Sequence, residues 1–170
     1  MPRLLLAACL AVCTLALAEE RRDGPGIRFS DDLVSRLEGR WELTRTIRGQ
    51  ESRSAAEADW VLDHQFLRLR MKDLAIPPKY EAHVYIGWSN ASQRYDIHWM
   101  DVWGGHYSGR GAGTRTGDTV EFRFPDPDGS AFFNTFAYDR AKDAWTMTLE
   151  NADRNAKRSL FASERWERAR

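Results

Sequence analysis

The chain has 170 residues, with 25 basic and 25 acidic side chains and a formal net charge of +0 at pH 7. This balance argues against nucleic acid or an anionic membrane surface as the main partner, because both favour a basic excess. The length suits one domain, and no internal repeat or low-complexity tract divides it.

The first residues have the layout of a secretory signal peptide. Arg3 precedes an apolar run, and an Ala-Leu-Ala sequence ending at Ala18 provides a cleavage site before Glu19. The run is shorter than the roughly 20 apolar residues of a membrane span. We therefore predict a signal peptide over 1–18 and export to a bacterial periplasm or the extracellular space. A lipoprotein site at Cys9 would leave too short an apolar region before it, so lipid anchoring is not favoured.

Both cysteines, Cys9 and Cys13, lie in the segment predicted to be removed. The mature chain therefore has no disulfide, no thiolate nucleophile and no cysteine-rich metal site. Residues 19–29 carry charges, two glycines and a proline without a hydrophobic period, and we expect a flexible tether there. The folded domain is expected over 30–170.

A short helix of roughly two turns is predicted over 30–38. Ser30 is a suitable N-cap, and Asp31 and Asp32 favour the positive end of a helix. Gly39 ends it. After this point no segment shows a convincing helical period.

From Arg40 onward apolar and polar residues alternate, and turn residues interrupt the pattern about every ten residues. Short strands at this spacing are typical of a sandwich or a barrel. We predict ten strands, at 40–48, 58–63, 65–73, 80–88, 93–103, 106–115, 119–125, 132–139, 144–151 and 158–167.

Two hairpins can be given a register from the sequence. Pairing 80–88 with 93–101 places Ala82 opposite Trp99, Val84 opposite Ile97, Ile86 opposite Tyr95 and, on the outer face, His83 opposite His98. Pairing 132–138 with 145–151 places Tyr138 opposite Trp145, Phe136 opposite Met147 and Asn134 opposite Leu149. Each hairpin has one apolar, aromatic face, which predicts a sheet wrapped around its own core.

Gly39 and Trp41 form a Gly-x-Trp sequence that resembles the opening of lipocalins and related calycins. In that superfamily a short helix leads into the first strand, the Trp closes one barrel end, and a basic side chain of the last strand stacks on it. Arg165 or Arg168 would take that part here. The stretch 95–113, followed by Gly-Asp, Asp-Gly and Tyr-Asp-Arg turns, resembles bacterial lipocalin-like domains of unknown function.

The resemblance covers nearly all of residues 30–167 in pattern. It implies an all-β, antiparallel, up-and-down closed barrel of about eight to ten strands with a short N-terminal helix and an internal cavity. It also implies a small-molecule-binding protein whose ligand is apolar or amphipathic, with no cofactor. Related haem-binding barrels use a histidine near the C-terminus, and this chain has none after His106, which argues against a haem site.

Within the predicted interior three polar residues intrude: Arg45, Asp101 and Asn134. An inward charge must be paired, lie near an open end or face a wet cavity. We predict that Asp101 lies near Tyr80 and Trp99 and that Arg45 faces the same interior. A direct pair would be structural, whereas a space between the two would suit a ligand's polar group. The candidate ligand-binding residues are Arg45, Tyr80, Tyr95, Trp99, Asp101 and Asn134.

No catalytic motif is present, and we predict neither catalytic residues nor a metal site. His83 and His98 lie on the outer face, which favours solvated side chains over a metal pair. Binding is the preferred function; a barrel enzyme with acid–base chemistry and a structural or protein-binding barrel with a filled core are the alternatives. Gly109, Gly111 and Gly113 share one face, which the sequence does not assign to the inside or the outside. The ligand and the oligomeric state are also left open.

Overall fold

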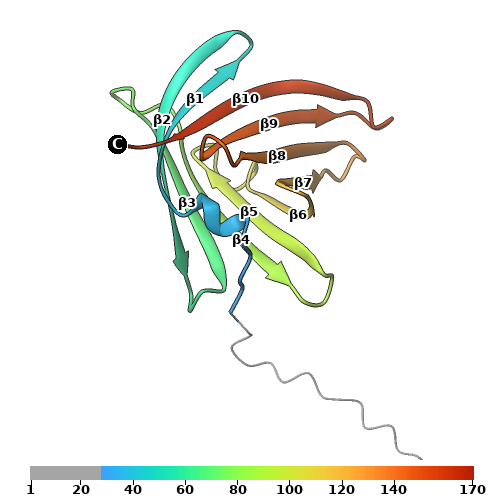
Figure 1. The fold of residues 1–170 in the computed structure, drawn as a ribbon. Helices are drawn as coiled ribbons and strands as arrows, with labels where there is room; N and C mark the ends of the chain where they lie inside the picture. Colours follow the sequence, from blue (N-terminus) through green and yellow to red (C-terminus); the bar gives the residue numbers. More distant parts are fainter. Residues whose placement is uncertain (1–27) are drawn as a thin grey trace, which may run out of the picture.

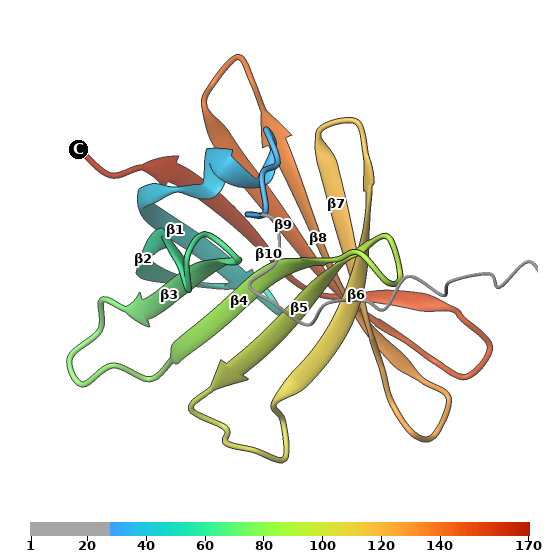
Figure 2. The ribbon, with the colours of Figure 1, turned by 90° about the horizontal axis from the view of Figure 1, so that it is seen from below.

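The computed structural model describes residues 28–170, so the predicted signal peptide, Cys9 and most of the tether lie outside the described residues. Ten antiparallel strands form a closed barrel (Figures 1 and 2), in which each strand pairs with its sequence neighbours and β1 pairs with β10. The strands are β1 (Gly39–Ile47), β2 (Gln50–Val61), β3 (Phe66–Asp73), β4 (Glu81–Ser89), β5 (Arg94–Asp101), β6 (Gly109–Thr116), β7 (Thr119–Pro125), β8 (Ala131–Asp139), β9 (Ala144–Ala152) and β10 (Arg158–Arg168). The predicted up-and-down barrel is confirmed. Within the described residues, no helix is long and apolar enough to cross a membrane.

All ten predicted strands are present, and burial alternates along them as the sequence pattern requires. The largest difference is in β2, which begins at Gln50 rather than at 58. Its first residues are mostly polar and carry little strand signal of their own. They form a strand because the tight β1–β2 hairpin pairs β2 with the whole length of β1, from Gly39–Ala58 to Ile47–Gln50.

The two predicted hairpin registers have different outcomes. The β8–β9 register is confirmed, with Asn134 opposite Leu149 and Phe136 opposite Met147. The β4–β5 register is wrong by two residues, since Val84 lies opposite Trp99. A shift of two keeps every side chain on its predicted face, so the apolar pattern does not distinguish the two pairings.

Residues 28–38 lie across one end of the barrel, which we call the capped end (Figure 2). The ring of Phe29 lies 5.5 Å from that of Trp60 and 6.1 Å from that of Tyr95. The Phe29 backbone N–H also donates to the His64 carbonyl, at 3.0 Å. Phe29 is buried in the core, so the packed domain includes a residue of the predicted tether.

The predicted helix over 30–38 is wrong in type and length, because the segment forms only a 3-10 turn, η1 (Val34–Leu37). The Asp31 carboxylate, not Ser30, accepts the first free N–H groups, from Leu33 at 2.9 Å and Val34 at 2.7 Å. Residues three apart share a face in a 3-10 turn, and Val34 and Leu37 are both buried. The chain enters β1 only two residues later, which leaves no room for a second α-helical turn.

The Gly-x-Trp sequence has the geometry that the resemblance implied. Trp41 is fully buried and its Nε1 donates to the Leu37 carbonyl at 2.6 Å. Arg168 holds its guanidinium carbon 3.9 Å from the centre of the Trp41 ring and donates to the Arg36 carbonyl at 3.0 Å. Arg165 lies on the outside and faces Glu167, so Arg168 is the stacking residue.

The alternating glycines of β6 face the barrel interior. Gly109, Gly111 and Gly113 pair with Trp99, Ile97 and Tyr95, which are inward residues of β5. A Cβ atom at Gly113 would lie 2.5 Å from the Phe122 ring, and one at Gly109 would lie 2.9 Å from the Phe124 ring. The missing side chains therefore make room for the two phenylalanine rings of β7.

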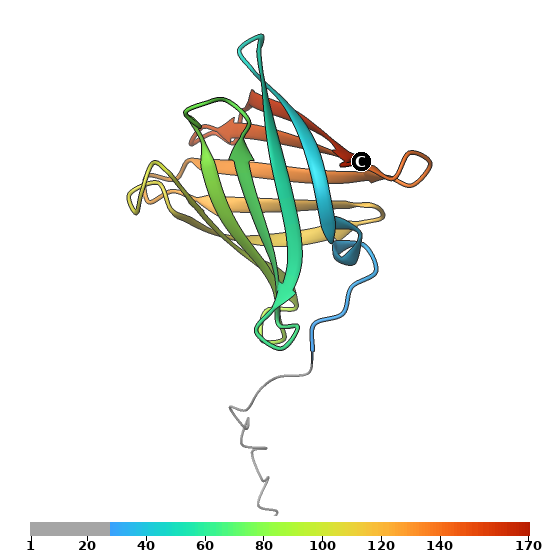
Figure 3. The same ribbon diagram turned by 90° about the vertical axis from the view of Figure 1, so that its left-hand side faces the viewer.

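The interior changes in character along the barrel axis. The capped half contains the fully buried Trp41, Trp145 and Trp166. The other end, the distal end, is formed by the connections at 48–49, 74–80, 102–108, 126–130 and 153–157. Figure 3 shows the β1–β2 tip at this end, far from η1. Toward it polar side chains take inward positions on β1, β3, β5 and β10, and the connections expose Leu74, Ile76, Val102, Trp103 and Tyr107.

Candidate functional site

A buried ion pair lies on the inner wall of the distal half. Arg45 and Glu164 are direct partners across β1 and β10, and the Arg45 Nε donates to Glu164 Oε1. Both are buried, with 7% and 3% of their surface exposed. The other carboxylate oxygen accepts a hydrogen bond of 2.8 Å from Trp166 Nε1. The two charges are thus paired and hydrogen-bonded, as a buried pair requires.

Burial opposes the charge on both members of this pair. Desolvation raises the pKa of Glu164, although the neighbouring guanidinium acts in the opposite direction. For Arg45, desolvation is the largest single influence and lowers the pKa. The attraction and the hydrogen bond of Glu164, with other contributions, outweigh it together and leave the pKa of Arg45 raised. Asp73 contributes to raising the pKa of Arg45 in the same direction as Glu164.

Tyr80 joins this pair to the end of β5. Arg45 holds its guanidinium carbon 4.4 Å from the centre of the Tyr80 ring. The Tyr80 hydroxyl accepts from Trp99 Nε1 at 3.1 Å and donates to Asp101 Oδ2 at 3.4 Å. Burial raises the pKa of Tyr80 to about 12. The structure therefore brings Asp101, Tyr80, Trp99 and Arg45 together on one inner wall.

Asp101 and Arg45 do not form an ion pair. Asp101 accepts from the Trp103 backbone N–H at 3.0 Å as well as from Tyr80, while Arg45 is bonded to Glu164. Asp73, at the inward end of β3, accepts from the buried Ser54 hydroxyl at 2.9 Å. We call Arg45, Tyr80, Asp73, Asp101 and Glu164, together with Trp99, the distal cluster.

Two of the predicted site residues lie apart from the distal cluster. Asn134 is inward and 2% exposed, but it stands on β8, where its Oδ1 has no hydrogen-bond partner among the described residues. Tyr95 lies at the capped end, where its hydroxyl donates to Asp31 at 2.6 Å. Burial, reinforced by Asp31, raises the pKa of Tyr95 to about 12. Tyr95 therefore belongs to the attachment of the N-terminal segment.

Solvent reaches the inner wall from the distal end. Asp73, Tyr80, Asp101 and Phe132 occupy inward positions near the distal end and are only partly buried. The distal end of the inner wall therefore combines hydrogen-bonded polar side chains with exposure to solvent. Such a combination suits the binding of a small molecule.

Sequence reasoning missed Glu164 and Asp73. Glu164 alternates with Ala162 and Trp166, which marks it as inward, but its partner becomes visible only when the first strand is paired with the last. That pairing was available in principle, because a closed barrel requires it. Asp73 continues the inward positions of β3 after Met71, at a strand end where alternation is a weak guide.

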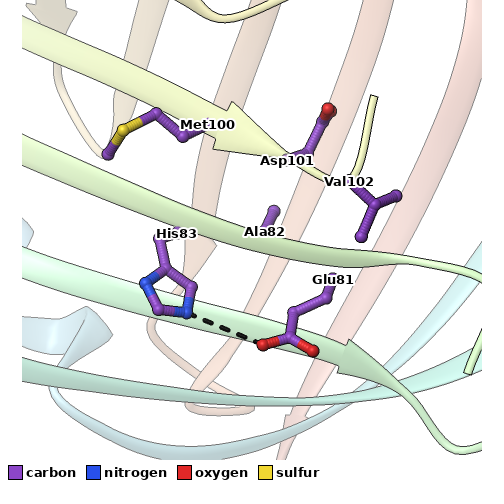
Figure 4. A pocket seen from close by; sticks show the side chains of 6 residues that line it. All are labelled: Glu81, Ala82, His83, Met100, Asp101 and Val102. Atoms are coloured by element: carbon purple, nitrogen blue, oxygen red, sulfur yellow. Dashed lines mark ion pairs between the residues drawn. The ribbon is translucent and has the colours of Figure 1, made fainter. Parts of the chain in front are cut away.

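A pocket of about 310 Å³ lies on the outer wall and is lined by Glu81, Ala82, His83, Met100, Asp101 and Val102. Figure 4 shows the Asp101 carboxylate pointing away from Glu81 and His83, whose nearest atoms are 3.8 Å apart. The predicted His83–His98 juxtaposition is wrong, because the corrected register places Met100 opposite His83. Residues 28–170 contain no group of three or more side chains able to hold a metal ion.

A larger outer groove, of about 580 Å³, extends over β1–β4. Its basic side chains are already paired across neighbouring strands, as in Arg53 with Glu42 at 2.7 Å and Lys72 with Glu81 at 2.8 Å. These exposed pairs form a solvated outer surface. The distal cluster is therefore the better candidate site.

Comparison with known proteins gives information on the fold alone. No protein-family model matches the chain, and no curated protein matches it. Among solved structures, the crystal structure of Rv2717c from M. tuberculosis superposes with a TM-score of 0.55 at 14% sequence identity. The match covers 81% of this chain and 95% of that one. The fold of this chain thus has a similar solved structure.

Proposed function

We propose that this protein is an exported, calycin-like barrel that binds one small amphipathic molecule in the distal half of its interior. The observation that carries the proposal is the distal cluster itself, a set of bonded polar side chains on an inner wall that solvent reaches from one end. A purely structural core has little use for such groups, because burying them costs free energy.

Two further features support this function. Barrels of about eight strands already have room for one small ligand, and this barrel has ten. The connections around the distal end expose apolar side chains, including Ile76 at 97% and Trp103 at 66%. Exposed apolar groups beside a partly open interior suit the entry of an apolar molecule.

A neutral, environment-sensitive probe, N-phenyl-1-naphthylamine, tests the proposal. We expect saturable binding of one probe per chain, with an increase in fluorescence. Ala162→Leu adds bulk to the inner wall beside Leu149 and should weaken binding at least tenfold. Ala55→Leu, the same change on the exposed outer face of β2, is the matched control. Should Ala162→Leu fail to fold, Ala82→Val on the inner wall of β4 replaces it.

If the probe shows no saturable binding, the proposal is wrong. If Ala162→Leu and Ala55→Leu bind the probe equally well, the site does not lie in the interior. Export is tested separately by N-terminal sequencing of the mature protein, for which we expect Glu19 as the first residue. A lipid-modified Cys9 would contradict that expectation.

A further inference from the structure

The inner wall of the distal half carries more negative than positive charge. Among the strand residues described, its inward charged side chains are Arg45 on β1, Asp73 on β3, Asp101 on β5 and Glu164 on β10. Glu164 neutralises Arg45 directly. Asp73 and Asp101 have only hydroxyl and backbone donors, and neither has an ion pair within residues 28–170. Whether Glu164 is protonated or ionised, the two aspartates leave an excess of negative charge.

Asn134 independently indicates a missing hydrogen-bond donor. Its side chain is inward, 2% exposed, and its Oδ1 has no partner among the described residues. Asn134 lies opposite Leu149, which lies opposite Ala162 of β10. Two strand spacings, about 10 Å, therefore separate it from the wall that carries Glu164. An unpaired buried acceptor is uncommon and calls for a donor from outside the chain.

The aromatic lining of this region suits a cation. Trp99 lies opposite Gly109, whose missing side chain leaves the Phe124 ring beside it. Phe132 extends this aromatic surface toward the distal end, where its ring packs 5.6 Å from that of Phe161. The faces of such rings attract ammonium groups.

We propose that the interior site selects an amphipathic amine, a molecule with an apolar body and a cationic nitrogen that carries N–H donors. This inference rests on the proposed function and names its ligand class. The charge of the aspartates attracts the ammonium group into the interior, and Asn134 Oδ1, which faces that interior from β8, accepts one of its N–H groups. The rings contact the apolar body. A carboxylate ligand is disfavoured, because the one inward guanidinium of the cluster is already bonded to Glu164.

Four ligands with the same twelve-carbon chain test the charge preference: dodecylamine, dodecyltrimethylammonium, dodecanol and dodecanoate. Each displaces N-phenyl-1-naphthylamine at pH 7, below its micelle concentration. We expect dodecylamine to bind at least tenfold more tightly than dodecanoate. Added salt should reduce this ratio, because it screens the aspartates.

Variants then separate the contributions of the groups. Asp101→Asn and Asp73→Asn should each reduce the amine-to-carboxylate ratio severalfold, while Glu81→Gln on the outer wall leaves it unchanged. Asn134→Leu should weaken the binding of dodecylamine severalfold. It should not weaken the binding of dodecyltrimethylammonium, which has no N–H to donate. The second comparison uses one variant with two ligands, so a loss of stability affects both alike.

The outcomes distinguish the two proposals. Equal or tighter binding of dodecanoate would overturn the preference for amines and leave the interior binding site intact. The same holds if all four ligands bind alike. If neither the probe nor any of the four ligands binds, the proposed function itself fails.

Discussion

At the scale of single residues, the Arg45–Glu164 pair is the feature of the interior whose stability depends most on the presence of both partners. Both side chains are almost inaccessible, at 9% and 0% exposure. Such a pair contributes little net stability, yet removal of one partner leaves a buried charge without compensation. Its stability effects should therefore be strongly non-additive.

We expect Arg45→Met to lower the free energy of unfolding by about 3–5 kcal/mol, because Glu164 is left unpaired. The double variant Arg45→Met/Glu164→Gln should recover part of this loss, since a neutral amide still accepts from Trp166. Urea unfolding at pH 7 provides the measurement. A double variant no more stable than the single one would show that the pair does not carry this coupling.

The raised pKa of Tyr80 predicts that the folded protein loses stability at alkaline pH. Its pKa is about 12 in the folded protein against an ordinary value of 10. The unfolded phenol loses its proton first, so the contribution is fully present below pH 10 and is lost as the pH rises from 10 to 12. The difference corresponds to about 2–3 kcal/mol.

Tyr80→Phe removes this titration but retains Tyr95, whose pKa is also about 12. We therefore expect the stability of the variant to fall less steeply above pH 10 than that of the unchanged protein. Urea midpoints at pH 9, 10 and 11 measure the difference. Parallel curves would show that Tyr80 is not buried as described.

At the scale of elements, the capped end depends on the last strand. Arg168 stacks on Trp41 and donates to two backbone carbonyls, of Arg36 and Glu38. We expect Arg168→Ala to cost about 1–3 kcal/mol, because it removes both the ring contact and the charged hydrogen bonds. Arg165→Ala, on the exposed face of the same strand, should have little effect. Equal effects in chemical denaturation would contradict this role.

The inward glycines of β6 set the spacing between neighbouring strands. A Cβ at Gly111 would lie 2.7 Å from the Arg123 carbonyl oxygen, which is backbone and moves only with β7. Gly111→Ala should therefore destabilise the protein by about 1–3 kcal/mol, as overpacking does. Gly105 lies in open space, and Gly105→Ala is the matched control. Thermal unfolding of both variants provides the comparison, and equal midpoints would show that β7 adapts freely.

The positions of the strands, and the side of the sheet that each residue faces, follow from local alternation, which explains why all ten strands could be predicted. The register between strands and the contacts between distant strands do not follow from local alternation. The β4–β5 register depends on a turn at 90–93 in which Gln93 has a φ of 52°, and the apolar pattern is the same for both registers. Glu164 faces Arg45 across 119 residues of sequence, so only ring closure brings the two together. The candidate site was thus predicted in its β4–β5 half and missed in its β10 half.

At the scale of the whole molecule, the barrel has two halves of different construction. The capped half combines large buried rings with the attached N-terminal segment, whereas the distal half combines polar inward groups with exposed connections. The ring of strands is continuous, so the halves share one hydrogen-bonded wall. Opening motions should nevertheless concentrate where few side chains are buried.

Hydrogen–deuterium exchange should reveal this difference. We expect backbone amides at 74–80 and 102–108 to exchange first, because these connections contain Ile76 and Trp103 in exposed positions and have few bonds to the strands. Amides at 33–43 should exchange late, because Leu33, Leu37 and Trp41 are buried there. Addition of dodecylamine should slow exchange at the distal connections and leave the capped end unchanged. Slowing at the capped end instead would place the ligand beneath the N-terminal segment, beside Tyr95, and would contradict a distal site.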